Sequence, residues 1–278
     1  MSERNDYPRG VPCWVDTLQP DVDAAVRFYA DLMGWTFAGP GPMPGDPPGR
    51  YFVAQLRGRD VAGVGSQPAH GGAPSMPVVW NTYVCTASAD DVAKEVEAAG
   101  GSVLREPFDV PPAGRVAVFA DPSGAVFGAW EPRDRRGAQL VNEPGSWSMS
   151  ILQTRDSEGA KAFYGAVFGW QAEPMKMNGG ELTLFRLPGY VGGEPQQPVP
   201  RDNVAVMLQM GPGGVPDEGP PRWAVDFRVT DADASAGNAK KLGGKVLAPP
   251  FDITGFRQAV LADPQGAVFS VSSRKPGG

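Results

Sequence analysis

The sequence predicts an α+β fold in which four β-α-β-β-β modules form two curved, cup-like sheets. Two repeated motifs predict this arrangement. The segment Asp-Pro-x-Gly-Ala-Val-Phe occurs at Asp121 and again at Asp263, about half of the chain further on. The pair Phe-Tyr, followed at a fixed distance by Gly-Trp, occurs at Phe28 and again at Phe163. Motifs that recur in the same order indicate an internal duplication, so each half of the chain can be compared with the other.

Each module begins with a strand and a helix and continues with further strands. In the first module Asp21 precedes the helix, where an acidic side chain is favourable, and Gly34 follows it. Between them, Val22, Ala25 and Tyr29 recur at helical spacing and predict its buried face. The first half is predicted to contain helices over 21–32 and 89–99, and strands over 12–18, 51–56, 61–65, 78–85, 103–108, 115–120 and 125–130.

The second half repeats this order after a charged segment that contains Gly and Pro. Strands are predicted over 147–153 and 223–229, and helices over 157–168 and 232–242. A charged, Gly- and Pro-containing segment between two such patterns is typical of a linker. We therefore predict an N-terminal domain over 8–132, a linker over 133–145 and a C-terminal domain over 146–274.

The composition narrows the classes of partner. The chain has 278 residues, 41% of them hydrophobic, which suits two packed domains. Its net charge of −6 argues against nucleic acid and anionic membranes, because both attract clustered Lys and Arg. No apolar run has membrane-spanning length, the polar N-terminus does not resemble a signal peptide, and two cysteines make no disulfide framework. We expect a soluble, cytoplasmic monomer or homodimer.

The doubled Phe-Tyr/Gly-Trp and Asp-Pro-x-Gly motifs resemble those of the vicinal oxygen chelate superfamily. This superfamily includes glyoxalase I, extradiol dioxygenases, and fosfomycin and bleomycin resistance proteins. The resemblance covers nearly the whole chain, and the layout is similar to two-domain glyoxalase-like proteins of actinobacteria, some called hydroxylases and others found in aromatic-polyketide pathways. It implies tandem domains, each an eight-stranded cup. For metal-binding members it also implies ligands at the start of each module's first strand and a Glu after the turn.

The six positions that match those metal ligands carry unsuitable side chains. Indole, thioether, methyl and hydrogen offer a hard divalent ion no oxygen ligand, and a single amide or hydroxyl is a poor one. The only histidine, His70, lies in a Gly-rich loop. We therefore predict that the protein holds no metal and no other cofactor. The six positions are Trp14, Asn81, Gly128, Met149, Ala224 and Ser270.

Strand alternation extends the prediction to the other residues that face each cup. Side chains two and four positions beyond a ligand position point to the same face. In the first half these side chains are largely aromatic or small, which suits a flat organic ligand with one or two polar contacts. The candidate ligand-binding residues are Trp14, Asp16, Asn81, Tyr83, Arg115, Gly128, Trp130, Met149, Asp226, Arg228, Arg257 and Ser270.

Several candidates also have a purely structural interpretation. Trp14 and Trp130 either contact a ligand or fill a cup that closed when the metal was lost. Cys85 is interpreted as a small core residue, because no histidine stands near it in the pattern to activate a thiolate. Arg115 and Arg257 occupy matching places in the two halves and are either sheet-edge bridges or anion contacts.

Asp16 and Asp226 lie inside predicted strands, where an unpaired carboxylate is costly. One interpretation pairs each of them with an arginine. In the other, one carboxylate binds or deprotonates a ligand, with its pKa changed by burial. The candidate arginine partners are Arg115, Arg228 and Arg257.

Two functions are consistent with these patterns. The first is a metal-free protein that sequesters or carries an apolar, aromatic small molecule such as an antibiotic or polyketide. The second is a metal-independent tailoring enzyme (a lyase, isomerase or hydroxylase accessory) of aromatic-polyketide or secondary metabolism, in which Asp16, Asp226 or Tyr83 transfers a proton. The sequence contains no nucleophile–base pair and no nucleotide motif, which favours the first.

Overall fold

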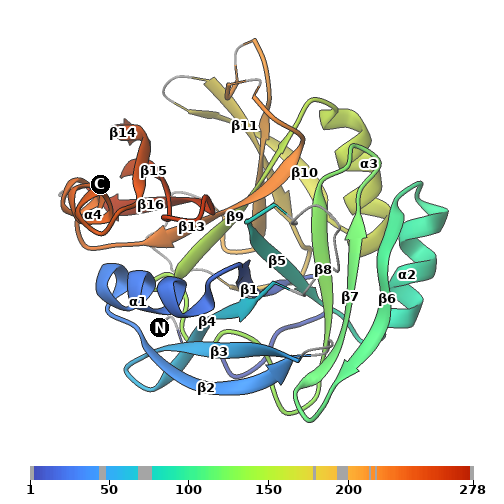
Figure 1. The fold of residues 1–278 in the computed structure, drawn as a ribbon. Helices are drawn as coiled ribbons and strands as arrows, with labels where there is room; N and C mark the ends of the chain where they lie inside the picture. The colour runs from blue at the N-terminus through green and yellow to red at the C-terminus, as the bar shows by residue number, and fades with distance from the viewer. Residues whose placement is uncertain are drawn as a thin grey trace. The chain divides into compact units, whose positions relative to one another are not determined.

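The computed structural model of the protein describes residues 3–43, 48–67, 77–177, 180–192, 200–212, 214–216 and 218–275. It contains two eight-stranded sheets, one in each half of the chain (Figure 1). The strand order of the first sheet is β2-β3-β4-β1-β5-β8-β7-β6, and the second sheet repeats it as β10-β11-β12-β9-β13-β16-β15-β14. The predicted duplication of β-α-β-β-β modules in an α+β fold is therefore confirmed. His70 lies outside the described residues.

Each predicted helix and strand is present, and its ends differ from the predicted range by at most two residues in either direction. The first half consists of β1 (Pro12–Gln19), α1 (Val22–Met33), β2 (Thr36–Met43), β3 (Gly49–Leu56), β4 (Arg59–Ser66), β5 (Trp80–Cys85), α2 (Ala89–Ala98), β6 (Ser102–Val110), β7 (Gly114–Ala120) and β8 (Val126–Pro132). The second half consists of β9 (Trp147–Thr154), α3 (Ser157–Phe168), β10 (Gln171–Met177), β11 (Gly180–Arg186), β12 (Asn203–Gln209), β13 (Arg222–Arg228), α4 (Ala232–Lys241), β14 (Lys245–Ile253), β15 (Phe256–Ala262) and β16 (Val268–Arg274).

The ends of helix α1 follow from the residues that flank it. The Asp21 carboxylate accepts a hydrogen bond from the backbone N–H of Ala24 at 2.9 Å, which satisfies a donor that the helix leaves unpaired. Gly34 ends the helix with φ of 73°, in the left-handed region that favours glycine. Within the described ranges, none of the helices combines the length and the apolar character that crossing a membrane requires.

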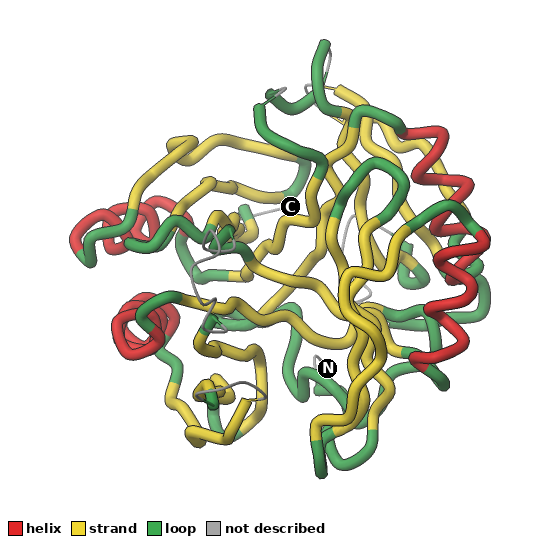
Figure 2. Tube along the Cα trace, turned by 45° about the vertical axis from the view of Figure 1, so that its right-hand side comes forward, coloured by secondary structure: helices red, strands yellow, loops and turns green. Residues whose placement is uncertain are grey.

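The chain forms two compact units, and each takes one module from either half. The first compact unit contains Met1–Trp14, Asn81–Gly137 and Met149–Ala224, and the second contains Val15–Trp80, Ala138–Ser148 and Val225–Gly278. Helices α2 and α3 of the first compact unit lie side by side, as do α1 and α4 of the second (Figure 2). The predicted domain boundaries follow the sequence repeat, whereas the compact units combine modules from both repeats.

The two repeated motifs meet in the core of the first compact unit. Tyr164, from the second Phe-Tyr pair, donates a hydrogen bond to Asp121 Oδ2 at 3.0 Å and accepts one from Trp223 Nε1 at 2.8 Å. The other oxygen of Asp121 accepts from the backbone N–H groups of Ser123 and Ala125, both at 2.9 Å, which closes the Asp-Pro-x-Gly turn. One buried carboxylate therefore joins the turn to the helix of another module.

The second compact unit repeats this arrangement with the other copies of the motifs. Tyr29 donates to Asp263 Oδ2 at 2.9 Å and accepts from Trp80 Nε1 at 2.9 Å. Gln19 Nε2 donates to the same carboxylate oxygen at 2.8 Å. Burial raises the pKa of Tyr29 and Tyr164 well above the ordinary tyrosine value, and the neighbouring carboxylates raise it further. Both hydroxyls therefore stay protonated and keep donating.

Candidate functional site

Strand β1 shows which face of the first sheet is accessible. Cys13 and Val15 are fully buried, whereas Trp14 and Leu18 are half-buried and Asp16 between them is 5% exposed. Successive residues of a strand point to opposite faces, so the even-numbered side chains share the accessible face. This is the face that the alternation argument assigned to the cup.

Tyr83 of β5 and Gly128 of β8 lie opposite each other in a parallel pair. A Cβ atom at position 128 would lie 2.2 Å from Cδ1 of Tyr83, far inside van der Waals contact, so the tyrosine ring covers this glycine. Tyr83 itself remains half-buried. The space above residue 128 is thus occupied by an aromatic ring.

Trp130 continues this aromatic surface two residues along β8. Its Nε1 donates to the backbone oxygen of Arg135 at 2.8 Å, and its ring lies against Gly114 of β7, where a Cβ would be 2.6 Å from Cζ2. Trp14 and Trp130 are both only partly buried and pack against the hydrophobic core of the first compact unit. We call Trp14, Tyr83 and Trp130 the aromatic face.

The matching positions of the second sheet are polar. Asp226 of β13 pairs with Ser270 of β16 in the register that pairs Tyr83 with Gly128 in the first sheet. Ser272 likewise stands where the first sheet has Trp130. The duplicated modules have therefore diverged into an aromatic surface in one half and a polar cluster in the other.

Asp226 is 4% exposed and accepts hydrogen bonds from four side chains. Ser270 and Gln258 donate to Oδ1 at 2.7 and 3.1 Å, while Ser148 and Ser272 donate to Oδ2 at 2.6 and 2.5 Å. A carboxylate has about four lone-pair positions, so these donors satisfy it in the sheet interior. Hydroxyl and amide groups donate here, where the sequence had suggested Arg228 or Arg257.

Arg228 lies two residues after Asp226 and is 7% exposed. Its guanidinium carbon is 4.2 Å from the ring centroid of Phe256, a cation–π distance. The candidate residues Asn81, Met149 and Ala224 are half-buried on their strands.

A second buried carboxylate, Asp16, accepts a hydrogen bond from Tyr51 Oη at 3.0 Å. Tyr51 lies on β3 and is half-buried. Sequence reasoning identified Asp16 but missed Tyr51, because period-two alternation assigns a face and not a partner two strands away. The available signal was Gly63-Val-Gly65 inside a strand, since glycine in a strand often marks a close approach.

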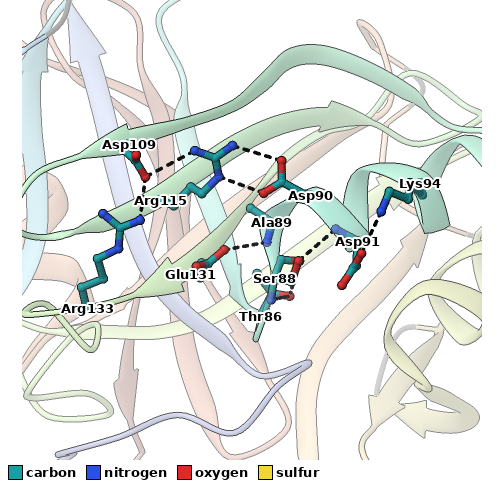
Figure 3. Close-up of polar contacts among 10 residues, drawn as sticks. All are labelled: Thr86, Ser88, Ala89, Asp90, Asp91, Lys94, Asp109, Arg115, Glu131 and Arg133. Atoms are coloured by element: carbon teal, nitrogen blue, oxygen red, sulfur yellow. Dashed lines mark hydrogen bonds and ion pairs between the residues drawn. The ribbon is translucent and has the colours of Figure 1, made fainter.

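Arg115 bridges the edge of the first sheet (Figure 3). Its Nε and Nη2 donate to the Asp90 carboxylate, each at 3.0 Å, and its Nη1 donates to Asp109 at 3.3 Å. Arg133 reaches the same Asp109 at 2.7 Å. The hydrogen bond from Arg115 lowers the pKa of Asp90 below its usual value. Of the two predicted roles of Arg115, the structure shows the sheet-edge bridge.

Figure 3 also shows the side chains that accept hydrogen bonds from the first turn of helix α2. The Glu131 carboxylate accepts from the backbone N–H of Ala89 at 2.9 Å, and Ser88 Oγ accepts from that of Asp91 at 3.1 Å. In the second sheet Arg257 repeats the bridge by pairing with Asp233 and with Asp252, the latter at 3.0 Å. Both arginines thus bind carboxylates other than Asp16 and Asp226.

Cys85 and Cys13 are buried free thiols. Cys85 Sγ donates to the backbone oxygen of Tyr7 at 3.1 Å, and Cys85 is 3% exposed. Burial raises the pKa of the Cys13 thiol well above its usual range, whereas the hydrogen bond with Cys13 lowers the pKa of the Cys85 thiol. The geometry agrees with the interpretation of Cys85 as a core residue.

Profiles of two related families match the two halves of the chain. Residues 14–128 match the glyoxalase/bleomycin resistance protein/dioxygenase superfamily, and residues 149–272 match a glyoxalase-like domain. A putative glyoxylase, CFP32, of Mycobacterium bovis is 39% identical over 280 residues, covering 99% of both chains. The chain belongs to the glyoxalase/bleomycin resistance protein/dioxygenase superfamily. Another relative, the anthracycline biosynthesis protein DnrV of Streptomyces peucetius, is 36% identical over 98% of this chain and 96% of its own.

Solved structures of the superfamily share the fold. The Mn(II)-bound glyoxalase of Novosphingobium aromaticivorans has a TM-score of 0.61 at 17% identity and covers 95% of this chain and 82% of its own. A 4-hydroxymandelate synthase variant of Streptomyces coelicolor has a TM-score of 0.57 at 12% identity, over 97% and 94% of the two chains. These likenesses establish the fold alone.

The residues of this chain do not fit the metal centre that the resemblance to the vicinal oxygen chelate superfamily implies. At the position expected to carry a carboxylate ligand, Gly128 has no side chain and lies under the ring of Tyr83. Its counterpart Ser270 donates its hydrogen bond to Asp226. Among the described residues, no group of three or more His, Cys, Asp or Glu side chains is arranged to hold a metal ion.

Proposed function

We propose that this protein binds a planar aromatic small molecule of the polyketide class on the aromatic face, without a metal. One observation carries the proposal. In the first compact unit, the ring of Tyr83 lies over Gly128, where metal-binding superfamily members are expected to carry a ligand. Side chains that stack on flat rings have replaced side chains that chelate.

The character of the aromatic face supports this ligand class. Trp14, Tyr83 and Trp130 are half-buried, so each ring keeps some accessible surface. Stacking of one aromatic ring on another contributes about 0.5–1.5 kcal/mol beyond the burial of apolar area. A relative 36% identical to this chain is called an anthracycline biosynthesis protein, and anthracyclines contain a flat, fused ring system.

The polar cluster in the second compact unit favours binding over acid–base catalysis as the main function. Four side chains donate to Asp226, so its lone pairs are engaged inside the protein. A general base needs a lone pair directed at the substrate. We therefore assign Asp226 a structural role that holds β9, β13, β15 and β16 together.

Tryptophan fluorescence and calorimetric titration test the proposal, with dimethoxyanthraquinone as the probe. Binding is expected to quench fluorescence, and Trp14→Ala is expected to weaken affinity about tenfold, which corresponds to ~1.4 kcal/mol. Leu104→Ala is the control, because Leu104 is 55% exposed on β6 and is not one of the candidate ligand-binding residues. It is expected to leave affinity unchanged.

A second measurement separates a ligand contact from a residue that only fills space. A tryptophan that plugs the cup would cost about 3–5 kcal/mol of stability when cut to alanine, without any effect on binding. Loss of stability in Trp14→Ala with no probe binding in the wild type would contradict the proposal. Elemental analysis of the purified protein that found about one transition metal per chain would contradict its metal-free character.

A further inference from the structure

We propose a second binding site, within the second compact unit, at which Asp16 and Tyr51 recognise a hydroxyl group on a small aromatic molecule. The proposal concerns residues other than the aromatic face and does not depend on it. The two side chains come from strands β1 and β3, with β4 between them in the sheet. They meet through the hydrogen bond from Tyr51 Oη to Asp16 Oδ2 at 3.0 Å.

Two glycines of β4 make room for this pair. Gly63 lies opposite Asp16, and a Cβ there would be 1.9 Å from Tyr51 Oη and 3.0 Å from Asp16 Cβ. At Gly65 a Cβ would be 2.8 Å from Cδ2 of the Tyr51 ring. The phenol therefore lies across β4, over backbone that carries no side chains.

Apolar side chains border the same place. A Cβ at Gly65 would also lie 2.8 Å from Met43 Sδ and 2.9 Å from a methyl carbon of Leu18. Met43, Leu18 and Tyr51 are all half-buried, so the surface they form with Asp16 is partly accessible. One buried carboxylate, one oriented phenol and an apolar rim are the elements of a small-molecule site.

The duplication provides an internal comparison. Strand register aligns the two sheets, because Asp16 pairs with Gly63 in the first as Ile151 pairs with Val206 in the second. The second sheet has aliphatic side chains at all four positions, without glycine and without a polar pair. The counterparts are Ile151 for Asp16, Val206 for Gly63, Leu208 for Gly65 and Leu182 for Tyr51.

The fold itself does not require glycines or a polar pair at these positions. The second sheet forms the same strand order with β-branched and aliphatic residues, which strands favour. Glycine inside a strand weakens it, and a carboxylate in a sheet interior costs free energy. In the first sheet both destabilising features occur at paired positions, because the buried Asp16 lies opposite Gly63. Departures from local preference that cluster in this way are expected at functional sites.

The chemistry of the pair selects for a hydroxyl. A phenol both donates and accepts hydrogen bonds, and a carboxylate accepts several. By donating to Asp16, Tyr51 is held in one orientation, with its oxygen and the carboxylate close together. A phenolic hydroxyl on a ligand can donate to either oxygen while its ring packs on Leu18 and Met43. A methyl ether of the same ligand cannot donate.

The test compares two probes, dihydroxyanthraquinone and dimethoxyanthraquinone, by titration calorimetry on the full-length protein. The wild type is expected to bind the hydroxyl probe at least tenfold more tightly. Tyr51→Phe keeps the ring over the glycines and removes only the hydroxyl, and Asp16→Asn removes the charge. Each is expected to reduce the ratio of the two affinities to near one. Asp31→Asn makes the same change at an exposed carboxylate of α1 and is expected to keep the wild-type ratio.

Thermal unfolding of the same variants establishes that each is folded at the titration temperature. Tyr51→Phe takes one donor from the buried Asp16 carboxylate, so it is expected to melt below the wild type and still to unfold cooperatively. Failure of the wild type to bind the hydroxyl probe, equal affinity for both probes, or a preference that persists in Tyr51→Phe would overturn the proposal. If Asp16→Asn does not fold, the affinity ratio measured for Tyr51→Phe alone tests the proposal. Trp14→Ala acts on the aromatic face, so it is expected to weaken binding of the methoxy probe and to raise the ratio, whereas Tyr51→Phe lowers it. The two proposals therefore fail separately.

Discussion

Removing the hydroxyl of Tyr29 tests whether the paired motifs hold the second compact unit together. In Tyr29→Phe, Trp80 Nε1 loses its acceptor and Asp263 loses one donor, while Gln19 and the turn backbone still donate to that carboxylate. A buried polar group left unsatisfied costs about 1–3 kcal/mol. The Trp80 indole loses its only described acceptor, and the Asp263 carboxylate loses one of several donors. We therefore expect a loss of about 2–4 kcal/mol in the free energy of unfolding.

The same variant is expected to change how stability depends on alkaline pH. Burial raises the pKa of Tyr29 in the folded protein, so its contribution is complete below the unfolded-state pKa of about 10. Above that pH only the unfolded chain ionises, and stability falls by up to ~1.4 kcal/mol per pH unit until the folded pKa is reached. Phenylalanine cannot ionise, so the decline in Tyr29→Phe is expected to be shallower.

Urea unfolding followed by circular dichroism, from pH 7 to pH 11, measures both effects. Tyr164→Phe is the matched variant, since Tyr164 makes the same two hydrogen bonds to Asp121 and Trp223. It is expected to show a similar loss and a similarly reduced alkaline slope. A loss below about 0.5 kcal/mol with an unchanged slope would show that the hydroxyl is not buried and bonded as described, and would refute the reasoning.

Two further substitutions probe the polar cluster and the aromatic face. Asp226→Ala leaves four donors without their acceptor, and we expect urea unfolding to report a loss of about 3 kcal/mol or more, against about 1 kcal/mol for Ser272→Ala. Equal losses of unfolding free energy in Asp226→Ala and Ser272→Ala would show that Asp226 does not stabilise the fold through all four donors. Gly128→Ala places a Cβ 2.2 Å from Tyr83, and we expect thermal unfolding to show a loss of about 1–3 kcal/mol that Tyr83→Ala relieves. A more stable Gly128→Ala would mean that the ring does not lie there.

The duplicated modules and the accessible strand faces followed from local patterns. The Asp-Pro-x-Gly turn depends on φ preferences within a few residues, and alternation along β1 depends only on the pleat. Both are properties of short segments, so they appear in the sequence without knowledge of the fold. Alternation predicted that Trp14 and Asp16 share one face of β1. It could not predict that Trp14 is half-buried whereas Asp16 is almost completely buried.

The partners of the buried carboxylates could not be predicted in the same way. Charge complementarity suggested arginine for Asp226, but the structure supplies serines and a glutamine. Hydroxyls satisfy a carboxylate equally well and leave no pattern in the sequence. Tyr51 was missed for a related reason, because its contact with Asp16 crosses a strand. Such contacts depend on register and ring orientation.

The pairing of Tyr29 with Asp263 has a consequence for how the chain acquires its structure during synthesis. The two residues are separated by 234 positions, so the core of the second compact unit stays open until Asp263 has left the ribosome. Tyr164 and Asp121 are separated by only 43 positions, so the first compact unit can close earlier. Contacts at long sequence separation form late, because loop closure costs entropy before they stabilise anything. The module that contains α1 therefore keeps the apolar face of that helix exposed until the module that contains Asp263 has been synthesised. We expect chaperones to bind a nascent chain that is halted between the two repeats.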